Sequence, residues 1–428
     1  FMYRAFGAHA FPFHLLMALL HALNSALLLA LARRLLSGAP TAVSYVAASL
    51  FAVHPIHTEA VNWIAALPDV LATTCALTGL LLFAAQNAAP TVAEALLHAA
   101  IYLAALLTKE TGVVLLPLYF AYQRLRGARA NAFMYRAMSA VLVAYLALRI
   151  HALGGLAPAQ HAFFRLTTAQ FCMSAAVLFG QYVLALIYPY PLRFFHVFHP
   201  TAGLSAALLL SVGLLVLLAW AFLRLGAISR TTFYAVFWVV VALAPVMNIG
   251  GVGQNVFAER YLYLPSAGFA ILAALAWQWL ARLQPKSAWP VAGAVLLACS
   301  IVTIDRNRDW VDDFTLLQVS LTQSPDSAYL HNLMAGAWVH RDQFELALEE
   351  QRLAVRYEPD AYLYHQNLGN ILLGVDPRAA AAEFLAAISI QPIAAELHSD
   401  LAIAYRDMGD ISKAQIEIER ATELRKTP

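Results

Sequence analysis

Carboxylate side chains are almost missing from the first 304 residues of this 428-residue chain. Only five of its 25 Asp and Glu residues lie there, although the same stretch holds 16 of the 27 Lys and Arg residues. A soluble domain carries charge on roughly a quarter of its residues, which keeps its surface in water. Residues 1–304 therefore predict a bundle of membrane-spanning helices, and the rest predicts an acidic, soluble domain.

The composition of the whole chain excludes several classes of protein. Hydrophobic residues make up 61% and charged residues 12%, and the formal net charge of +2 provides no basic stripe for nucleic acid. Cys75, Cys172 and Cys299 show no paired spacing, which argues against a disulfide framework or a zinc site. The sequence contains no glycine motif for binding phosphate or a dinucleotide.

Charge-free windows recur along residues 1–304, and their length is that of a membrane-spanning helix, about 20 residues. They predict helices near residues 11–32, 41–53, 68–85, 92–107, 111–123, 133–150, 167–188, 203–223, 231–246, 262–282 and 287–304.

Short loops rich in Lys and Arg face the cytoplasm, which predicts the orientation of the bundle. The basic clusters are Arg33-Arg34, Arg124/Arg126/Arg129/Arg136, Arg224/Arg230 and Arg282/Lys286. The C-terminal domain and the loops 54–67, 108–110, 151–166, 189–202 and 247–261 are then expected outside. Three segments separate the second and third clusters, although their number must be even. We therefore expect one of them, 167–188 in the first instance, to be re-entrant or broken.

The acidic domain repeats with a period of 33–34 residues. Pro325, Pro359 and Pro392 recur at that spacing, and so do Ala347, Ala380 and Ala414. This period with small residues at helix contacts is the tetratricopeptide signature, a stack of helix pairs that mostly binds peptides. We predict an all-α chain with a transmembrane bundle over 1–304, a linker over 305–326 and three repeats over 327–428.

Four of the five carboxylates in residues 1–304 fall at predicted outer helix ends. These are Glu59, Asp69, Glu110 and Glu259, whereas Glu94 falls on the inner side. Ionisable residues at membrane depth are costly and usually functional. With His54, His57, Lys109 and Arg260 they supply cations for a phosphate and carboxylates for acid–base chemistry or sugar hydroxyls. We expect them to converge on one membrane face, as a site for a lipid-linked phosphosugar requires.

Each of these features also has a purely structural interpretation. His54 and His57 could bind a metal, but the intervening Pro55 and the lack of a third ligand favour hydrogen bonding. Lys109-Glu110 and Glu259-Arg260 could be ion pairs between sequence neighbours. Trp63 and the run 188–191 are more typical of an aromatic belt than of a sugar platform.

Three blocks of sequence resemble a known family: HPIHTE at 54–59, TKETG at 108–112 and ERYLYLP at 259–265. Together with Asp69 and the C-terminal repeats, they are similar to the transmembrane and tetratricopeptide-repeat (TMTC-like) protein O-mannosyltransferases and their bacterial relatives. That family belongs to the GT-C superfamily of glycosyltransferases.

The resemblance implies transfer of a sugar, mannose in the animal members, from a polyprenyl-phosphate donor to a protein Ser or Thr hydroxyl presented by the repeats outside the cytoplasm. It implies that Lys109 and Arg260 bind the donor phosphate.

On the same basis, Glu59 and Asp69 are expected to support catalysis, and His54, His57, Glu110, Glu259 and Tyr261 to contact substrate. The principal catalytic Asp is expected in an outer loop that this chain lacks, so we expect the chain by itself to be inactive.

Other interpretations of the chain stay open. The sequence assigns no cofactor beyond the lipid-linked donor and no metal ligand, and it leaves a divalent metal open. The membrane is the bacterial inner membrane with periplasmic repeats, or the endoplasmic reticulum with lumenal repeats. The alternative function is a non-enzymatic membrane scaffold, which would not need four outer-face carboxylates. A transporter would place its charges nearer the midplane.

Overall fold

The structure is a computed structural model that describes residues 7, 9–86, 90–127, 132–155, 166–247, 249 and 255–426. The described residues form helices and connecting loops without strands, so the predicted all-α fold is confirmed. The chain divides into two compact units, Phe1–Arg308 and Asp309–Pro428.

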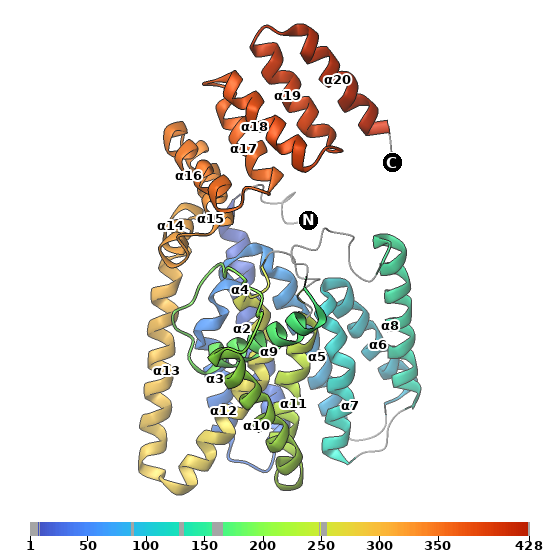
Figure 1. Ribbon diagram of the computed structural model, residues 1–428. Helices are drawn as coiled ribbons and strands as arrows, with labels where there is room; N and C mark the ends of the chain where they lie inside the picture. Colours follow the sequence, from blue (N-terminus) through green and yellow to red (C-terminus); the bar gives the residue numbers. More distant parts are fainter. Residues whose placement is uncertain are drawn as a thin grey trace. The chain divides into compact units, whose positions relative to one another are not determined.

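The first unit is a bundle of apolar helices (Figure 1). Its α-helices are α2 (Ala10–Leu35), α3 (Thr41–Val53), α4 (Thr58–Asn62), α5 (Leu67–Ala85), α6 (Val92–Thr108), α7 (Leu115–Arg126), α8 (Ala132–Leu153), α9 (Thr168–Ile187), α10 (Ala206–Ile228), α11 (Arg230–Leu243), α12 (Tyr263–Leu283) and α13 (Pro285–Arg308).

Seven helical segments of the described chain are long and apolar enough to cross a membrane, judged by length and composition. They are Ala10–Leu35, Ile64–Ala85, Ala132–Leu153, Thr168–Ile187, Arg230–Met247, Glu259–Leu283 and Pro285–Arg308. Many of their large side chains, such as Leu148 and Leu297, are exposed on the outside of the bundle, as lipid-facing residues are. We conclude that the chain is an integral membrane protein.

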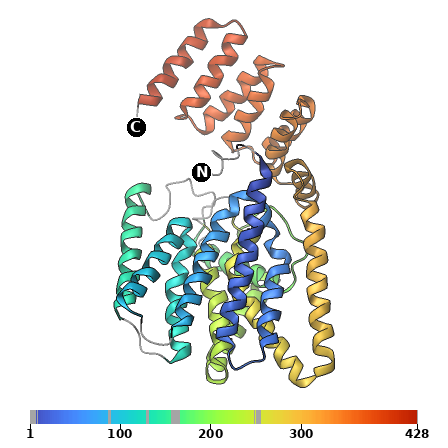
Figure 2. The same cartoon turned by 180° about the vertical axis from the view of Figure 1, so that it is seen from behind.

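Basic residues gather at one end of this unit. The last turns of α2, α7 and α12 carry Arg33 and Arg34, Arg124 and Arg126, and Arg282. These helix ends lie together at the lower end of the bundle in Figures 1 and 2. Arg129, which the sequence placed in the second cluster, lies outside the described residues.

Helix α9 differs from its neighbours in direction. In Figure 1 it runs obliquely across the view, between α8 and α13, which both stand nearly upright. Its length and hydropathy would allow it to cross a membrane. Its axis, however, is not parallel to the axes of the neighbouring long helices.

The second unit consists of α14 (Asp313–Gln323) and three helix pairs. The pairs are α15 (Ala328–Val339) with α16 (Phe344–Tyr357), α17 (Tyr362–Leu372) with α18 (Pro377–Ile390), and α19 (Ala395–Asp407) with α20 (Ile411–Lys426). Small residues allow the paired helices to approach: a Cβ on Gly369 would lie 2.6 Å from the ring of Phe384. Helix α14 occupies much of the segment expected to be a linker.

A histidine with two acceptors recurs in every helix pair. Nδ1 of His331 lies 2.6 Å from Oε2 of Glu350, and Nε2 lies 2.9 Å from the carbonyl oxygen of Pro325. The same contacts recur in the other pairs, between His365, Glu383 and Pro359 and between His398, Glu417 and Pro392. At His331 these contacts outweigh burial and raise the pKa of the imidazole above its usual value, because a ring that faces two acceptors is favoured when both of its nitrogens carry a proton.

Candidate functional site

The segment between α3 and α5 folds into short helical turns that bury its charges. Pro55 begins the turn Pro55–His57, and Nδ1 of His54 accepts a hydrogen bond from the backbone N–H of Ile56. Proline at this position costs no hydrogen bond, because the first N–H groups of a helix have no partner. The segment then turns again through α4, which places Glu59 inside the protein.

Glu59 forms a buried ion pair with Arg260, a residue 201 positions later. Its Oε1 accepts a hydrogen bond from Nη1 of Arg260, and its Oε2 accepts one from the backbone N–H of Arg260 at 3.0 Å. Glu59 is 0% exposed, whereas the side chain of Arg260 is 12% exposed. Both oxygens of Glu59 are thus used to hold Arg260 in the short turn Glu259–Leu262, directly before α12.

A second ion pair joins Asp69 in the first turn of α5 to Lys109 at the end of α6. The side chain of Lys109 is 14% exposed and that of Asp69 is 9% exposed. Gly112 allows the chain after Lys109 to lie close against α6, since a Cβ on Gly112 would lie 2.6 Å from the backbone of Ala105. The turn Glu110–Val114 can therefore pack directly on α6.

The ion pairs join residues distant in sequence rather than sequence neighbours. Lys109 does not pair with Glu110, because the extended backbone at Lys109 turns the two side chains apart. Arg260 likewise pairs with Glu59 rather than with Glu259. The interpretation of these neighbours as local ion pairs is therefore wrong.

Aromatic rings complete the contacts of the two cations. The guanidinium of Arg260 lies 4.6 Å from the ring centre of Trp63 and 4.7 Å from that of Tyr261, and Nζ of Lys109 lies 4.8 Å from the Tyr261 ring. Nη2 of Arg260 also lies 3.3 Å from the Tyr261 hydroxyl. Trp63, expected in an aromatic belt, thus stacks on a site residue.

These residues surround an open hollow of about 310 Å³. It is lined by Trp63, Ala65, Pro68, Asp69, Thr108, Lys109, Glu110, Arg260 and Tyr261. The hollow lies where α6 ends and α5 and α12 begin, which is the opposite end of α12 from Arg282. It therefore lies at the end of the bundle that the sequence predicted to face outward.

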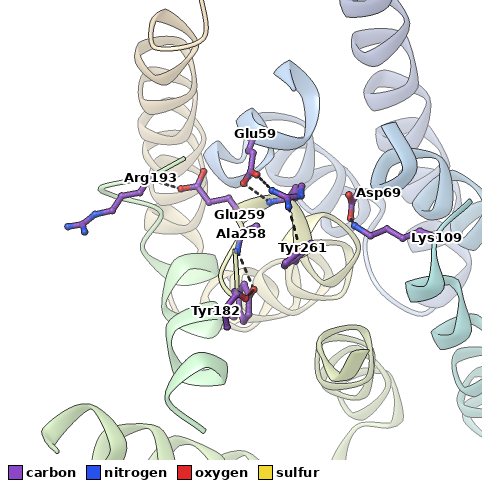
Figure 3. A network of polar contacts seen from close by, with 10 residues as sticks. Glu59, Asp69, Lys109, Tyr182, Arg193, Ala258, Glu259 and Tyr261 are labelled. Carbon is purple, nitrogen blue, oxygen red and sulfur yellow. Dashed lines mark hydrogen bonds and ion pairs between the residues drawn. The ribbon is translucent and has the colours of Figure 1, made fainter. Parts of the chain in front are cut away.

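Four predicted site residues do not line the hollow: His54, His57, Glu59 and Glu259. Figure 3 shows Glu259 directed toward Arg193 and away from Asp69 and Lys109, and its Oε1 accepts a hydrogen bond from the Arg193 backbone N–H at 2.5 Å. His54 and His57 are buried in the bundle. The structure therefore gathers Asp69, Lys109, Glu110, Arg260 and Tyr261, with Glu59 directly behind Arg260.

The two histidines have partners of their own inside the protein. Nε2 of His54 lies 3.0 Å from the carbonyl oxygen of Leu186, and burial lowers the pKa of His54 to about 4. Nε2 of His57 lies 2.7 Å from Oγ of Ser266, and burial also lowers the pKa of His57. Within the described parts of the chain, no three His, Cys, Asp or Glu residues form a group that could hold a metal ion.

A polar network that the sequence analysis missed lies beside His57. The Tyr263 hydroxyl lies 2.8 Å from Nδ1 of His21 and 3.2 Å from Nδ2 of Asn24. His21 and Asn24 are polar residues within an otherwise apolar helix, and such residues usually face the interior of a bundle. The sequence alone could therefore have indicated that His21 and Asn24 face the interior of the bundle.

The comparisons agree with this picture for part of the chain. Protein O-mannosyl-transferase TMTC3 is 31% identical over 170 residues in Mus musculus, covering 39% of this chain and 18% of the relative. Its Homo sapiens counterpart gives the same identity over 39% of this chain and 19% of the relative. Protein O-mannosyl-transferase F38B6.6 of Caenorhabditis elegans is 25% identical over 311 residues, or 68% of this chain and 42% of the relative.

Two further comparisons add little to the sequence similarity. No family model matches the chain. Among solved structures, MamA AMB-1 is 21% identical with a TM-score of 0.26, covering 31% of this chain and 80% of that one, and MamA MSR-1 is similar at 20% and 0.25.

The chain spans about a fifth of the length of the TMTC3 proteins and about two fifths of that of F38B6.6. Over the aligned residues, this integral membrane protein is similar in sequence to the TMTC protein O-mannosyl-transferases, which confirms the resemblance inferred from its motifs.

Proposed function

We propose that the membrane unit is a GT-C type glycosyltransferase that binds a polyprenyl-phosphate sugar, mannose in the first instance, in the hollow between α5, α6 and α12. The observation that carries this proposal is the meeting of two cation–carboxylate pairs from four separate segments of an apolar bundle. Buried charges are costly, and a bundle that only anchors a soluble domain has no need for them at one helix end.

The two cations can bind a phosphate while they keep their carboxylates. A guanidinium has five N–H donors and an ammonium has three. Arg260 uses its Nη1 for Glu59 and lies near Tyr261 with its Nη2, and Lys109 uses one donor for Asp69. The remaining donors can bind phosphate oxygens, because both side chains reach the surface of the hollow.

The proposed reaction places these charges where they are needed. The acceptor oxygen forms a bond to the anomeric carbon, the bond from that carbon to the phosphate oxygen breaks, and a carboxylate takes the hydroxyl proton. Cations held in place beforehand stabilise the negative charge that develops on the departing phosphate. Asp69 reaches the hollow, whereas the fully buried Glu59 can act only by holding Arg260.

The remaining roles follow from the resemblance and form part of the proposal. The acceptor is a protein Ser or Thr hydroxyl on the non-cytoplasmic side, and the helix-pair unit recruits it. Stacked helix pairs of this type present a concave face to peptides. A divalent metal, if it is needed, would bind together with the donor phosphate.

The test is binding of polyprenyl phosphate to the full chain in lipid nanodiscs. We expect Arg260→Met and Lys109→Met each to weaken binding by about tenfold or more, since each removes a charged donor to the phosphate. Arg282→Met is the matched control, because it removes a cation from the other end of α12. Equal binding by all three variants and the unchanged chain would exclude the hollow as the phosphate site.

A further inference from the structure

Glu110 differs from the other carboxylates near the hollow. Glu59 and Asp69 are each paired with a cation and are almost completely buried. Glu110 lines the hollow, is exposed, and has no ion-pair or hydrogen-bond partner among the described residues. It is also close enough to Asp69 for the two negative charges to repel each other. The balanced pairs therefore leave Glu110 as the unpaired charge of the site.

This arrangement gives the hollow two chemically different sides. Lys109 and Arg260 offer donors to an anion, whereas the Glu110 carboxylate repels an anion and accepts hydrogen bonds from hydroxyl groups. A phosphosugar has the matching polarity, because its phosphate is anionic and its sugar ring carries hydroxyl donors. A donor in this hollow would be oriented with its phosphate toward the cations and its sugar toward Glu110.

We infer that Glu110 binds the sugar hydroxyls of the lipid-linked donor and thereby orients the sugar relative to the phosphate. This inference rests on the proposed function, since it assumes that a phosphosugar occupies the hollow. It assigns Glu110 a contact that Glu59 cannot make, because both oxygens of Glu59 already accept hydrogen bonds from Arg260. Glu110 accepts hydrogen bonds in this role and takes up no proton.

The contribution of Glu110 can be separated from that of the cations by comparing two ligands. Binding of polyprenyl-phosphate mannose and of bare polyprenyl phosphate is measured on the full chain in nanodiscs. We expect Glu110→Ala to weaken binding of the mannosylated lipid about tenfold, the loss of one hydrogen bond to a charged group. Binding of the bare lipid stays the same or becomes tighter, because a repulsive charge is removed.

Two further variants sharpen the test. Glu110→Gln keeps an acceptor oxygen without the charge, so its loss for the mannosylated lipid should be smaller than that of Glu110→Ala. Glu349→Ala removes another exposed carboxylate, in α16, and should change neither affinity.

The outcomes distinguish this inference from the proposed function. If Glu110→Ala weakens both lipids equally, or neither, then Glu110 does not contact the sugar and the inference fails while the phosphate site stands. If the unchanged chain binds neither lipid, the proposed function fails and the inference fails with it.

Discussion

The pairing of Glu59 with Arg260 determines how the site is held at the level of single residues. Glu59 is fully buried and gives both oxygens to one arginine, so its removal leaves a guanidinium with little access to water. Breaking one partner of a buried ion pair is far more costly than removing an exposed pair, because the remaining charge is uncompensated.

We therefore predict that Glu59→Gln lowers the free energy of unfolding by about 3 kcal/mol. Asp305→Asn is the control: its pair with Arg308 has side chains that are 71% and 78% exposed, so its loss should cost well under about 1 kcal/mol. Thermal unfolding of the full chain in detergent measures both. Similar small shifts for the two variants would contradict the account.

The sequence identified most of the residues of the hollow but not their partners. Asp69, Lys109, Glu110 and Arg260 could be predicted because charged groups are rare in an apolar block. Tyr261 was predicted because it lies in the ERYLYLP block that carries the family resemblance. The pairing of the charged residues could not be predicted, because it depends on which helix ends meet in space. The role of Trp63 was missed for the same reason, since its contact with Arg260 joins residues almost 200 positions apart.

At the level of elements, the turn Glu110–Val114 carries Glu110 on its first residue and begins directly after Lys109. The sequence predicted a continuous helix over 111–123, but α7 begins only at Leu115. The difference comes from Gly112, whose missing side chain lets the turn pack on the backbone of α6. A hydropathy pattern cannot predict such a close approach between two backbone segments.

We predict that Gly112→Ala moves this turn away from α6 and weakens binding of polyprenyl phosphate at least several-fold, because its Cβ would lie 2.6–2.9 Å from backbone atoms. Gly293→Ala in α13 is the matched control, since nothing lies within 4 Å of the Cβ it adds. Binding that is the same in the two variants would show that the turn does not depend on Gly112.

The histidine of the first helix pair predicts a pH dependence. Burial alone would lower the pKa of His331, but its hydrogen bonds to Glu350 and Pro325 outweigh burial and raise it above 6.5. The folded protein then retains a proton that the unfolded chain releases. The contribution of His331 to stability is fully present below pH 6.5 and is lost as the pH rises through the folded-state pKa.

We expect amides of α15 and α16 to be less protected from hydrogen exchange at pH 9 than at pH 6, after correction for intrinsic exchange rates. His331→Asn should reduce this difference, because asparagine does not titrate. Unchanged protection between the two pH values in the original chain would contradict the assignment.

At the scale of the whole molecule, the sequence predicted the long helices of the membrane unit to within a few residues, but it predicted a linker where α14 lies. The helix over 41–53 was predicted at its observed bounds, since Pro40 precedes it and His54-Pro55 follows it. The tetratricopeptide period likewise located three helix pairs. The sequence indicated an unusual segment at α9 only through the odd number of segments between two basic clusters. Composition determines the length of an apolar helix but not its tilt.

The central claim is that a lipid-linked sugar phosphate binds in the hollow, and its location can be measured directly. A photoreactive polyprenyl-phosphate mannose is cross-linked to the full chain in nanodiscs, and the labelled peptides are identified by mass spectrometry. The account predicts labelling in 63–69, 108–112 and 258–263, which an excess of unlabelled donor suppresses. Labelling confined to the lipid-facing sides of the helices, or to the basic end near Arg282, would contradict it.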